Sequence, residues 1–223
     1  MQSDEIKPVE FHLFAELLGR SNATILDVGA NDGTHTNAFL SLFPHARVFA
    51  FEPEPRAIAK WRARVLDPRA VLFEVGVAAE AGRRTFHQST GTPPEVFHPQ
   101  DYPAGWDQSG SIRRPARHIE MVDWVHFGDT IEIDVVTLDG WAEREKVRGV
   151  DLIWADVQGA EGDLIAGGRR VLDRTRYLYT EFSDHEMYEG EWGLAQIVAA
   201  LPDFEVIKVF ESDVLLRNRC FAL

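Results

Sequence analysis

Short apolar runs alternate with segments of helical spacing through the first third of the chain. The runs at Thr24–Val28, Arg47–Phe51 and 70–75 have the length of buried strands, and the segments 36–43 and 55–66 between them are amphipathic. This β-α-β-α-β alternation with short connections predicts a parallel sheet with right-handed crossovers. Ligands of such sheets bind beyond the carboxyl ends of the strands.

A similar alternation returns after residue 138, and an amphipathic helix precedes the first strand. That helix runs from Pro8 to Leu18 and ends at Gly19, so the N-terminal helical segment covers 8–20. The last two strands are separated by only three residues, which predicts a hairpin. The elements expected in the last part are helices at 138–146, 160–172 and 192–201 and strands at 150–156, 176–182, 204–209 and 213–218.

The segment 78–139 differs, because Gly and Pro recur along it and argue against long helices. Alternating polar and apolar positions predict a short edge strand at 84–87 and another strand at 130–138. We therefore expect one domain over residues 1–223, in which 78–139 is an inserted, β-rich lid and substrate region over the carboxyl edge of the sheet. The aromatic residues that favour a packed lid over a disordered loop are Phe97, Tyr102 and Trp106.

The chain is acidic, with 23 basic and 36 acidic residues among 223 and a formal net charge of −13. General nucleic-acid binding relies on a basic surface, so we expect no nucleic-acid partner. The single cysteine, Cys220, allows no internal disulfide. No secretory signal and no apolar stretch near the ~20 residues that span a bilayer are apparent, which predicts a cytoplasmic protein without a membrane partner. The one local basic patch, interpreted as a solvated face that balances nearby acids, consists of Arg113, Arg114, Arg117 and His118.

A glycine-rich turn follows the first strand, and acids stand at the ends of three strands. Gly29 and Gly33 allow backbone angles that side chains forbid and let the main chain approach a ligand. Asp27, Glu52 and Asp156 end the strands at 24–28, 47–51 and 150–156, so we expect them to line one crevice. A carboxylate that ends the second strand can accept both hydroxyls of a ribose.

Two cofactors fit a glycine turn of this kind. A nicotinamide-dependent oxidoreductase typically has the pattern G-x-G-x-x-G, in which backbone N–H groups bind the pyrophosphate of the cofactor. This turn has a different glycine pattern, and the carboxylates of Asp27 and Asp32 would repel a pyrophosphate. They suit a ligand with hydroxyl, ammonium and sulfonium groups, such as S-adenosylmethionine.

These motifs resemble the FkbM family of S-adenosylmethionine-dependent methyltransferases over roughly residues 23–182. The resemblance implies a class I methyltransferase fold, Rossmann-like α/β, with a mostly parallel seven-stranded sheet, helices on both faces and one antiparallel strand near the C-terminus. It also implies O-methylation of hydroxyls, often on sugars or secondary metabolites. The motifs are Asp27-Val28-Gly29-Ala30-Asn31-Asp32-Gly33, Phe51-Glu52-Pro53, Asp156-Val157-Gln158-Gly159-Ala160-Glu161 and Gly167-Gly168.

The resemblance also assigns the cofactor site. Gly76 and Val77 fall where the adenine would lie, and Ser109-Gly110-Ser111-Ile112 resembles a serine-containing stretch of the family. The chain departs from the family at Ile153-Trp154, where many members have a lysine, and at Gln158, where many have glutamate. The expected cofactor-binding residues are Asp27, Gly29, Ala30, Asn31, Gly33, Glu52, Pro53, Gly76, Val77, Asp156 and Val157.

Methylation of a hydroxyl needs a group that removes its proton as attack proceeds. Asp156 is the first candidate and His185 the second, and the resemblance places Glu161 beside the methyl group as well. A Mg²⁺ ion held by Asp156, Glu181 and Asp184 is an alternative, although carboxylates bonded to loop backbone are the favoured interpretation.

The function expected from the sequence is thus O-methylation of a small molecule, sugar or glycan. A nicotinamide-dependent oxidoreductase and a non-catalytic binding module of the same fold remain as alternatives, and neither the acceptor nor the oligomeric state follows from the sequence.

Overall fold

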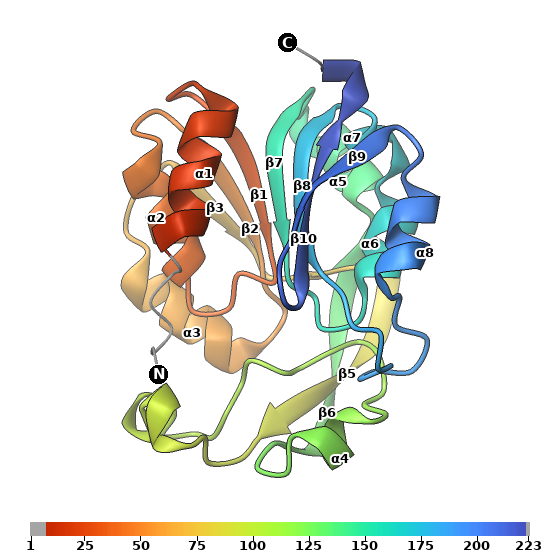
Figure 1. Cartoon of the computed structure of the whole chain (residues 1–223). Coiled ribbons are helices and arrows are strands. Elements are labelled where there is room, and N and C mark those ends of the chain that lie inside the picture. The colour runs from red at the N-terminus through yellow and green to blue at the C-terminus, as the bar shows by residue number, and fades with distance from the viewer. Residues whose placement is uncertain (1–7, 222–223) are drawn as a thin grey trace.

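A seven-stranded sheet forms the centre of the molecule, in the order β3-β2-β1-β7-β8-β10-β9 (Figure 1). The structure, a computed structural model, describes residues 8–221. β10 runs antiparallel to both of its neighbours, and the other pairings are parallel. The strands are β1 Thr24–Val28, β2 Arg47–Phe51, β3 Ala70–Phe73, β7 Val150–Ala155, β8 Thr175–Glu181, β9 Phe204–Val209 and β10 Asp213–Asn218. This confirms the mostly parallel seven-stranded sheet, with one antiparallel strand near the C-terminus, that the resemblance to the FkbM family implies.

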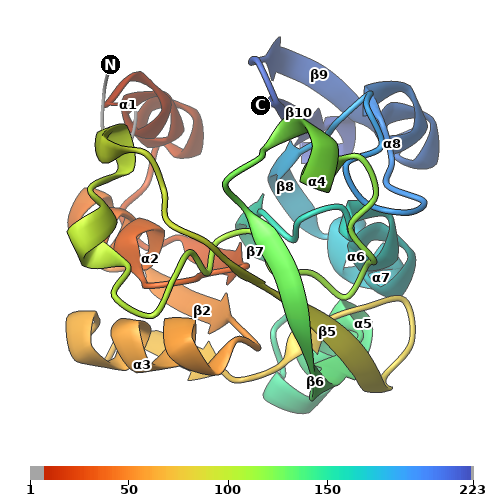
Figure 2. The ribbon, with the colours of Figure 1, turned by 90° about the horizontal axis from the view of Figure 1, so that it is seen from below.

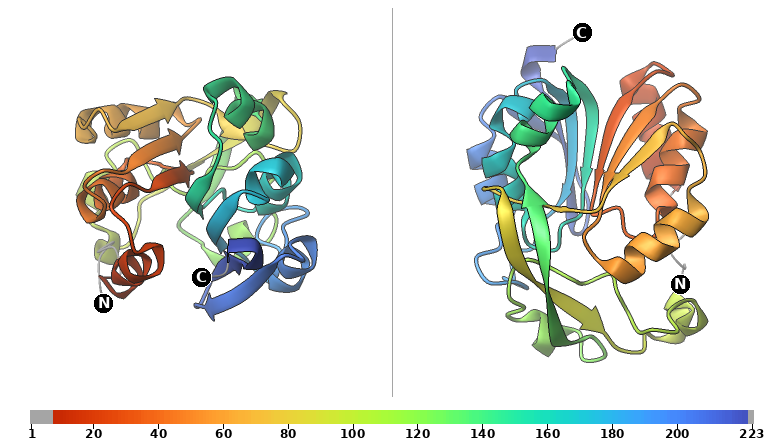
Figure 3. Two further views of the ribbon diagram at one scale, coloured as in Figure 1. Left: turned by 90° about the horizontal axis from the view of Figure 1, so that it is seen from above. Right: turned by 180° about the vertical axis from the view of Figure 1, so that it is seen from behind.

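Helices cover both faces of this sheet (Figures 1 and 3). One apolar core lies between the sheet and α1 Pro8–Leu18, α2 Thr34–Leu42 and α3 Pro55–Arg64. A second core lies on the opposite face, against α5, α6, α7 and α8. These four helices are Leu138–Glu145, Glu161–Gly167, Arg169–Leu172 and Leu194–Ala200. The sequence places the helix starts, since Glu54 accepts a hydrogen bond from the Arg56 N–H and Thr137 accepts one from Gly140.

The inserted segment and the two residues before it, Gly76 and Val77, form a second, three-stranded sheet in the order β4-β6-β5. It passes below the carboxyl edge of the main sheet, as the view from below shows (Figure 2). Its aromatic side chains pack together, with ring centroids 4.8 Å apart for Tyr102 and Trp106 and 5.4 Å apart for Phe97 and Trp106. The elements are β4 Gly76–Val77, β5 Gly82–Thr90, β6 His126–Val136, the 3-10 helices η1 Glu95–Phe97 and η2 Pro99–Asp101, and α4 His118–Met121. A last 3-10 helix, η3 Arg219–Phe221, follows β10.

Most expected elements are present, and the differences have local causes. The single helix expected at 160–172 is divided into α6 and α7, because the helix is interrupted at Gly168. A Cβ on Gly167 would lie 2.2 Å from the carbonyl oxygen of Ala78, so the glycine permits close contact with the chain after β4. The strand expected at 70–75 ends at Phe73, because Gly76 and Val77 pair with β6 instead. The strands expected at 84–87 and 130–138 are longer than predicted and pair with each other.

Among the described residues, no helix combines the length and apolar character needed to cross a membrane.

Candidate active site

One cavity of about 950 Å³ lies where the carboxyl edge of the main sheet meets the inserted segment. Its volume is in the range of cofactor and substrate sites. Nine of the eleven expected cofactor residues line it, and the other two, Asp27 and Gly33, do not. The expected catalytic residues Glu161 and His185 are also absent from its lining. The nine are Gly29, Ala30, Asn31, Glu52, Pro53, Gly76, Val77, Asp156 and Val157.

The turn after β1 is fixed between the ends of β2 and β7. Gly29 has φ +84°, and a Cβ there would lie 1.8 Å from the carbonyl oxygen of Asp156. The backbone N–H groups of Gly29 and Ala30 both donate to the carbonyl of Phe51, at 3.0 Å. The N–H of Asp156 donates to Val28 at 2.9 Å. This glycine therefore allows three strand ends to meet at one point.

Asp27 has a place that the sequence analysis did not expect. Its side chain is fully buried and absent from the cavity wall, and Oδ2 accepts a hydrogen bond of 2.5 Å from the Thr36 hydroxyl. Trp61 in turn donates to that hydroxyl at 3.2 Å. Burial raises the pKa of Asp27. The expectation that three strand-end acids line one crevice is thus met by Glu52 and Asp156, whereas Asp27 joins β1 to α2 and α3.

Glu52 is held rigidly at the end of β2. Its Oε2 accepts from the backbone N–H of Asn31 at 2.9 Å, and its Oε1 accepts from that of Glu54 at 2.8 Å. Burial raises the pKa of Glu52 to about 8. The amide oxygen of Asn31 is buried and has no hydrogen-bond partner among the described residues. A carboxylate oxygen has two lone pairs, so each oxygen of Glu52 can accept one further hydrogen bond.

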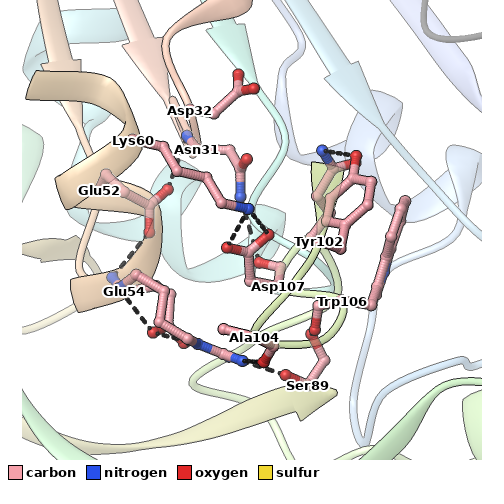
Figure 4. A network of polar contacts seen from close by, with 12 residues as sticks. Asn31, Asp32, Glu52, Glu54, Lys60, Ser89, Tyr102, Ala104, Trp106 and Asp107 are labelled. Atoms are coloured by element: carbon pink, nitrogen blue, oxygen red, sulfur yellow. Dashed lines mark hydrogen bonds and ion pairs between the residues drawn. The ribbon is translucent and has the colours of Figure 1, made fainter. Parts of the chain in front are cut away.

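The inserted segment is fastened to this turn by polar contacts that the sequence analysis did not predict (Figure 4). The Lys60 ammonium lies 2.8 Å from Oδ2 of Asp107 and 4.7 Å from the ring centroid of Tyr102. The Asn31 side-chain amide donates to the backbone oxygen of Asp107 at 3.2 Å. Nearby, Arg56 donates to the backbone oxygen of Ser89 at 2.8 Å. Nothing local in the sequence marks Lys60, because its partner lies 47 residues further along the chain.

A second polar cluster stands at the ends of β7 and β8. The side-chain amide of Gln158 donates to Asp156 at 2.6 Å and to Glu181 at 3.0 Å. Burial and then the charge of Asp156 raise the pKa of Glu181 well above its usual range. The hydroxyl of Tyr188 lies 3.0 Å from Oε1 of Gln158 and 2.8 Å from the backbone oxygen of Ser109. The cluster therefore holds two acids side by side at the cavity wall.

Glu161 and His185, expected to be catalytic, lie elsewhere. Glu161 is buried beneath the β7 turn, where Oε1 accepts from the Val157 N–H at 3.3 Å, and burial raises its pKa to about 8. His185 is exposed and does not line the cavity. No group of three His, Cys, Asp or Glu side chains in residues 8–221 is arranged to hold a metal ion. The set of Asp156, Glu181 and Asp184 is therefore not arranged as a metal site.

The basic patch divides between paired, exposed and buried side chains. Arg113 forms an ion pair with Asp163, with Nη2 and Oδ2 2.7 Å apart, which agrees with a role in balancing acids. Arg114 and Arg117 are exposed. His118 is buried against Phe127, with ring centroids 5.2 Å apart, and burial lowers its pKa.

Comparisons with known proteins agree with this architecture. The sequence matches the methyltransferase FkbM domain family over residues 27–211. It is 45% identical over 208 residues to "2-O-methyltransferase NoeI" of Sinorhizobium fredii, across 91% of this chain and 82% of the relative. It is 24% identical to "31-O-demethyl-FK506 methyltransferase FkbM" of Streptomyces tacrolimicus, across 89% and 78% of the two chains.

Among solved structures, a methyltransferase FkbM from Methylobacillus flagellatus has a similar fold. Its TM-score is 0.52 at 14% identity, with 88% of this chain covered. This chain spans 43% of the length of that chain. The family match decides against the nicotinamide-dependent alternative. The chain belongs to the FkbM family of methyltransferases.

Proposed function

We propose that this S-adenosylmethionine-dependent O-methyltransferase acts on a hydroxyl group of a saccharide, at the 2-position. The observation that carries the proposal is that Glu52 and Asn31 share one cavity with the acid pair Asp156 and Glu181. The 45% identity to a 2-O-methyltransferase over 91% of the chain supports the position of transfer.

The residues on the β1 and β2 side suit S-adenosylmethionine. Glu52 would accept the two ribose hydroxyls, and the unpartnered amide oxygen of Asn31 offers a further acceptor. Gly76 and Val77 provide a small apolar surface for the adenine. When bound, S-adenosylmethionine supplies an electrophilic methyl group on a positively charged sulfur, and the acids of the wall suit that charge.

The acids at the ends of β7 and β8 suit the acceptor. As the acceptor oxygen bonds to the methyl carbon, the carbon–sulfur bond breaks and the hydroxyl proton has to leave. Asp156 would take this proton, because it lines the cavity and is oriented by Gln158 at 2.6 Å. Glu181 shares the same amide and would hold the acceptor by a hydrogen bond. Glu161 would position the backbone of Val157 rather than contact the substrates.

Residues 78–139 would act as the lid over both substrates within one domain. The protein would work in the cytoplasm. Asp156 and Glu181 could together hold a Mg²⁺ ion, and adding EDTA to the assay tests this. Loss of activity that Mg²⁺ restores would establish the metal ion, whereas unchanged activity would exclude it.

The test combines cofactor binding with methyl transfer. Calorimetric titration with S-adenosylmethionine should show saturable binding that Glu52→Ala weakens at least tenfold and that the exposed control Glu80→Ala leaves unchanged. Transfer of labelled methyl groups to a panel of oligosaccharides should fall at least a hundredfold in Asp156→Asn, while that variant still binds the cofactor. A protein that binds no S-adenosylmethionine, or an Asp156→Asn variant of full activity, would contradict the proposal.

A further inference from the structure

The cavity extends past Asp156 into a second sector, which we call the acceptor sector. The cofactor residues stand at β1, β2 and β4, whereas this sector is walled by α1, α2, β7, β8 and β10. Its position follows from the strand order, because β1 and β7 are neighbours and the topology changes direction between them. The side chains that line the sector, besides Asp156 and Glu181, are Phe11, His35, Trp154, Tyr179, Ser212 and Asp213.

One wall of the acceptor sector is aromatic. Trp154 and Tyr179 are register partners on β7 and β8, and their rings stack with centroids 4.1 Å apart and planes 9° apart. The ring centroid of His35 from α2 lies 4.7 Å from that of Trp154, with the planes tilted by 46°, and Phe11 from α1 stacks on His35 at 6.2 Å. A pyranose ring has an apolar face of C–H groups, and such a face packs on aromatic rings.

The polar side of the acceptor sector is acidic. Asp213 is the register partner of Glu181, and Asp156 is joined to Glu181 through Gln158. The charges of Asp156 and Asp213 both act to raise the pKa of Glu181, so the three acids influence one another.

No lysine or arginine among the described residues lines this sector. The two basic side chains of that kind at the cavity wall, Lys60 and Arg64, pair with Asp107 and Asp32 on the cofactor side.

Carboxylates accept hydrogen bonds from hydroxyl and ammonium groups and repel phosphate, sulfate and carboxylate. We infer that the acceptor sector binds an uncharged saccharide, with one ring face on the half-buried His35 ring, which is backed by the buried Trp154, and its hydroxyls on Glu181 and Asp213. This inference rests on the proposed function. A sugar that still carries a phosphate or a nucleotide is excluded, so where the acceptor derives from such a sugar, a glycosyl transfer or a hydrolysis must remove that group before the methylation.

The test uses saturation-transfer NMR on the protein saturated with S-adenosylhomocysteine. The probes are methyl glycosides of glucose, galactose, mannose and their 6-deoxy forms, each compared with the 1-phosphate of the same sugar. We expect saturation transfer to at least one methyl glycoside, strongest on one face of the ring, and none to the phosphates.

Two variants link the signal to the sector. His35→Ala and Asp213→Asn should each weaken binding of the methyl glycoside at least tenfold. The controls His45→Ala and Asp203→Asn replace the same residue types at exposed positions outside the cavity, and they should leave binding of the methyl glycoside unchanged. All four should bind S-adenosylhomocysteine as the wild type does.

The inference is overturned if no methyl glycoside receives saturation, if a phosphate binds as well as its neutral counterpart, or if His35→Ala and Asp213→Asn bind normally. Each of these results leaves the cofactor intact, whereas failure of the wild type to bind S-adenosylhomocysteine would instead overturn the proposed function.

Discussion

The ammonium of Lys60 on α3 lies 2.8 Å from Oδ2 of Asp107 in the inserted segment. Asp107 is buried, whereas 29% of the Lys60 side chain is exposed. The backbone oxygen of Asp107 also accepts from Asn31 in the turn after β1. One residue of the insertion thus contacts both the helix that follows β2 and the turn that follows β1.

Removal of Lys60 should loosen the insertion over the cofactor side. Lys60→Met leaves the buried Asp107 carboxylate without its cation, which we expect to lower the free energy of unfolding by about 2 kcal/mol. The affinity for S-adenosylmethionine should fall as well, because Asn31 loses a fixed partner. Urea denaturation and calorimetry measure the two effects.

The matched control is the double variant Lys60→Met, Asp107→Asn, which removes both charges. It should be more stable than Lys60→Met alone, and a double-mutant cycle gives the coupling between the two residues. Additive effects would show that the contact does not hold the insertion.

Gly29 should tolerate no side chain. Gly29→Ala places a Cβ 1.8 Å from the carbonyl oxygen of Asp156 at φ +84°, so the ends of β1 and β7 have to separate. We expect a loss of at least about 3 kcal/mol in the free energy of unfolding, together with loss of cofactor binding. Gly128→Ala is the control, because a Cβ there meets nothing within 4 Å. Equal stability of the two variants would contradict the packing described here.

The affinity for S-adenosylmethionine should rise with pH. Burial raises the pKa of Glu52 to about 8, so in the free protein this carboxyl is mostly protonated at pH 6 to 7. Two ribose hydroxyls donate best to the anion, so binding has to release that proton. We expect the association constant to increase by up to about tenfold per pH unit between about pH 6 and 8 and then to level off. Titrations at several pH values should show this slope in the wild type and a flat profile in Glu52→Gln.

Stability should depend on pH through Glu161. Its pKa is about 8 in the folded protein, against an ordinary value of 4.5. Between those values the folded state holds the proton that the unfolded state has lost, so the contribution of this carboxyl is complete below about pH 4.5 and is lost as pH rises through about 8. Glu161→Gln is neutral at every pH and should become more stable relative to the wild type as pH rises. The difference should grow by up to about 1.4 kcal/mol per pH unit.

Urea denaturation of the wild type and Glu161→Gln at pH 5, 6, 7 and 8 checks this. Glu80→Gln serves as control, because its side chain is 85% exposed and should give a constant difference. A constant difference for Glu161→Gln as well would mean that the carboxyl is ionised in the folded protein.

The sequence by itself determined the elements and the family. The apolar runs predicted β1, β2 and β7 nearly to the residue, because burial on both faces leaves a continuous apolar pattern. The hairpin of β9 and β10 was predicted from the three residues that separate its strands, and β9 is partly exposed at the edge of the sheet. The motifs around Gly29, Glu52 and Asp156 indicated the cofactor turn. Such signals are local, since each depends on residues close together in the chain.

Only the tertiary structure decided which side chains meet in the cavity. Asp27 and Asp156 both stand at strand ends, yet Asp27 turns into the core toward Thr36, whereas Asp156 lines the cavity. His185 lies close in sequence to β8 but remains exposed. The pairing of Lys60 with Asp107 joins residues 47 positions apart, and the ring contact of His35 with Trp154 joins α2 to β7. Such contacts depend on the path of the insertion and on the packing of helices on the sheet. The local pattern of hydrophobic and polar residues therefore does not predict them.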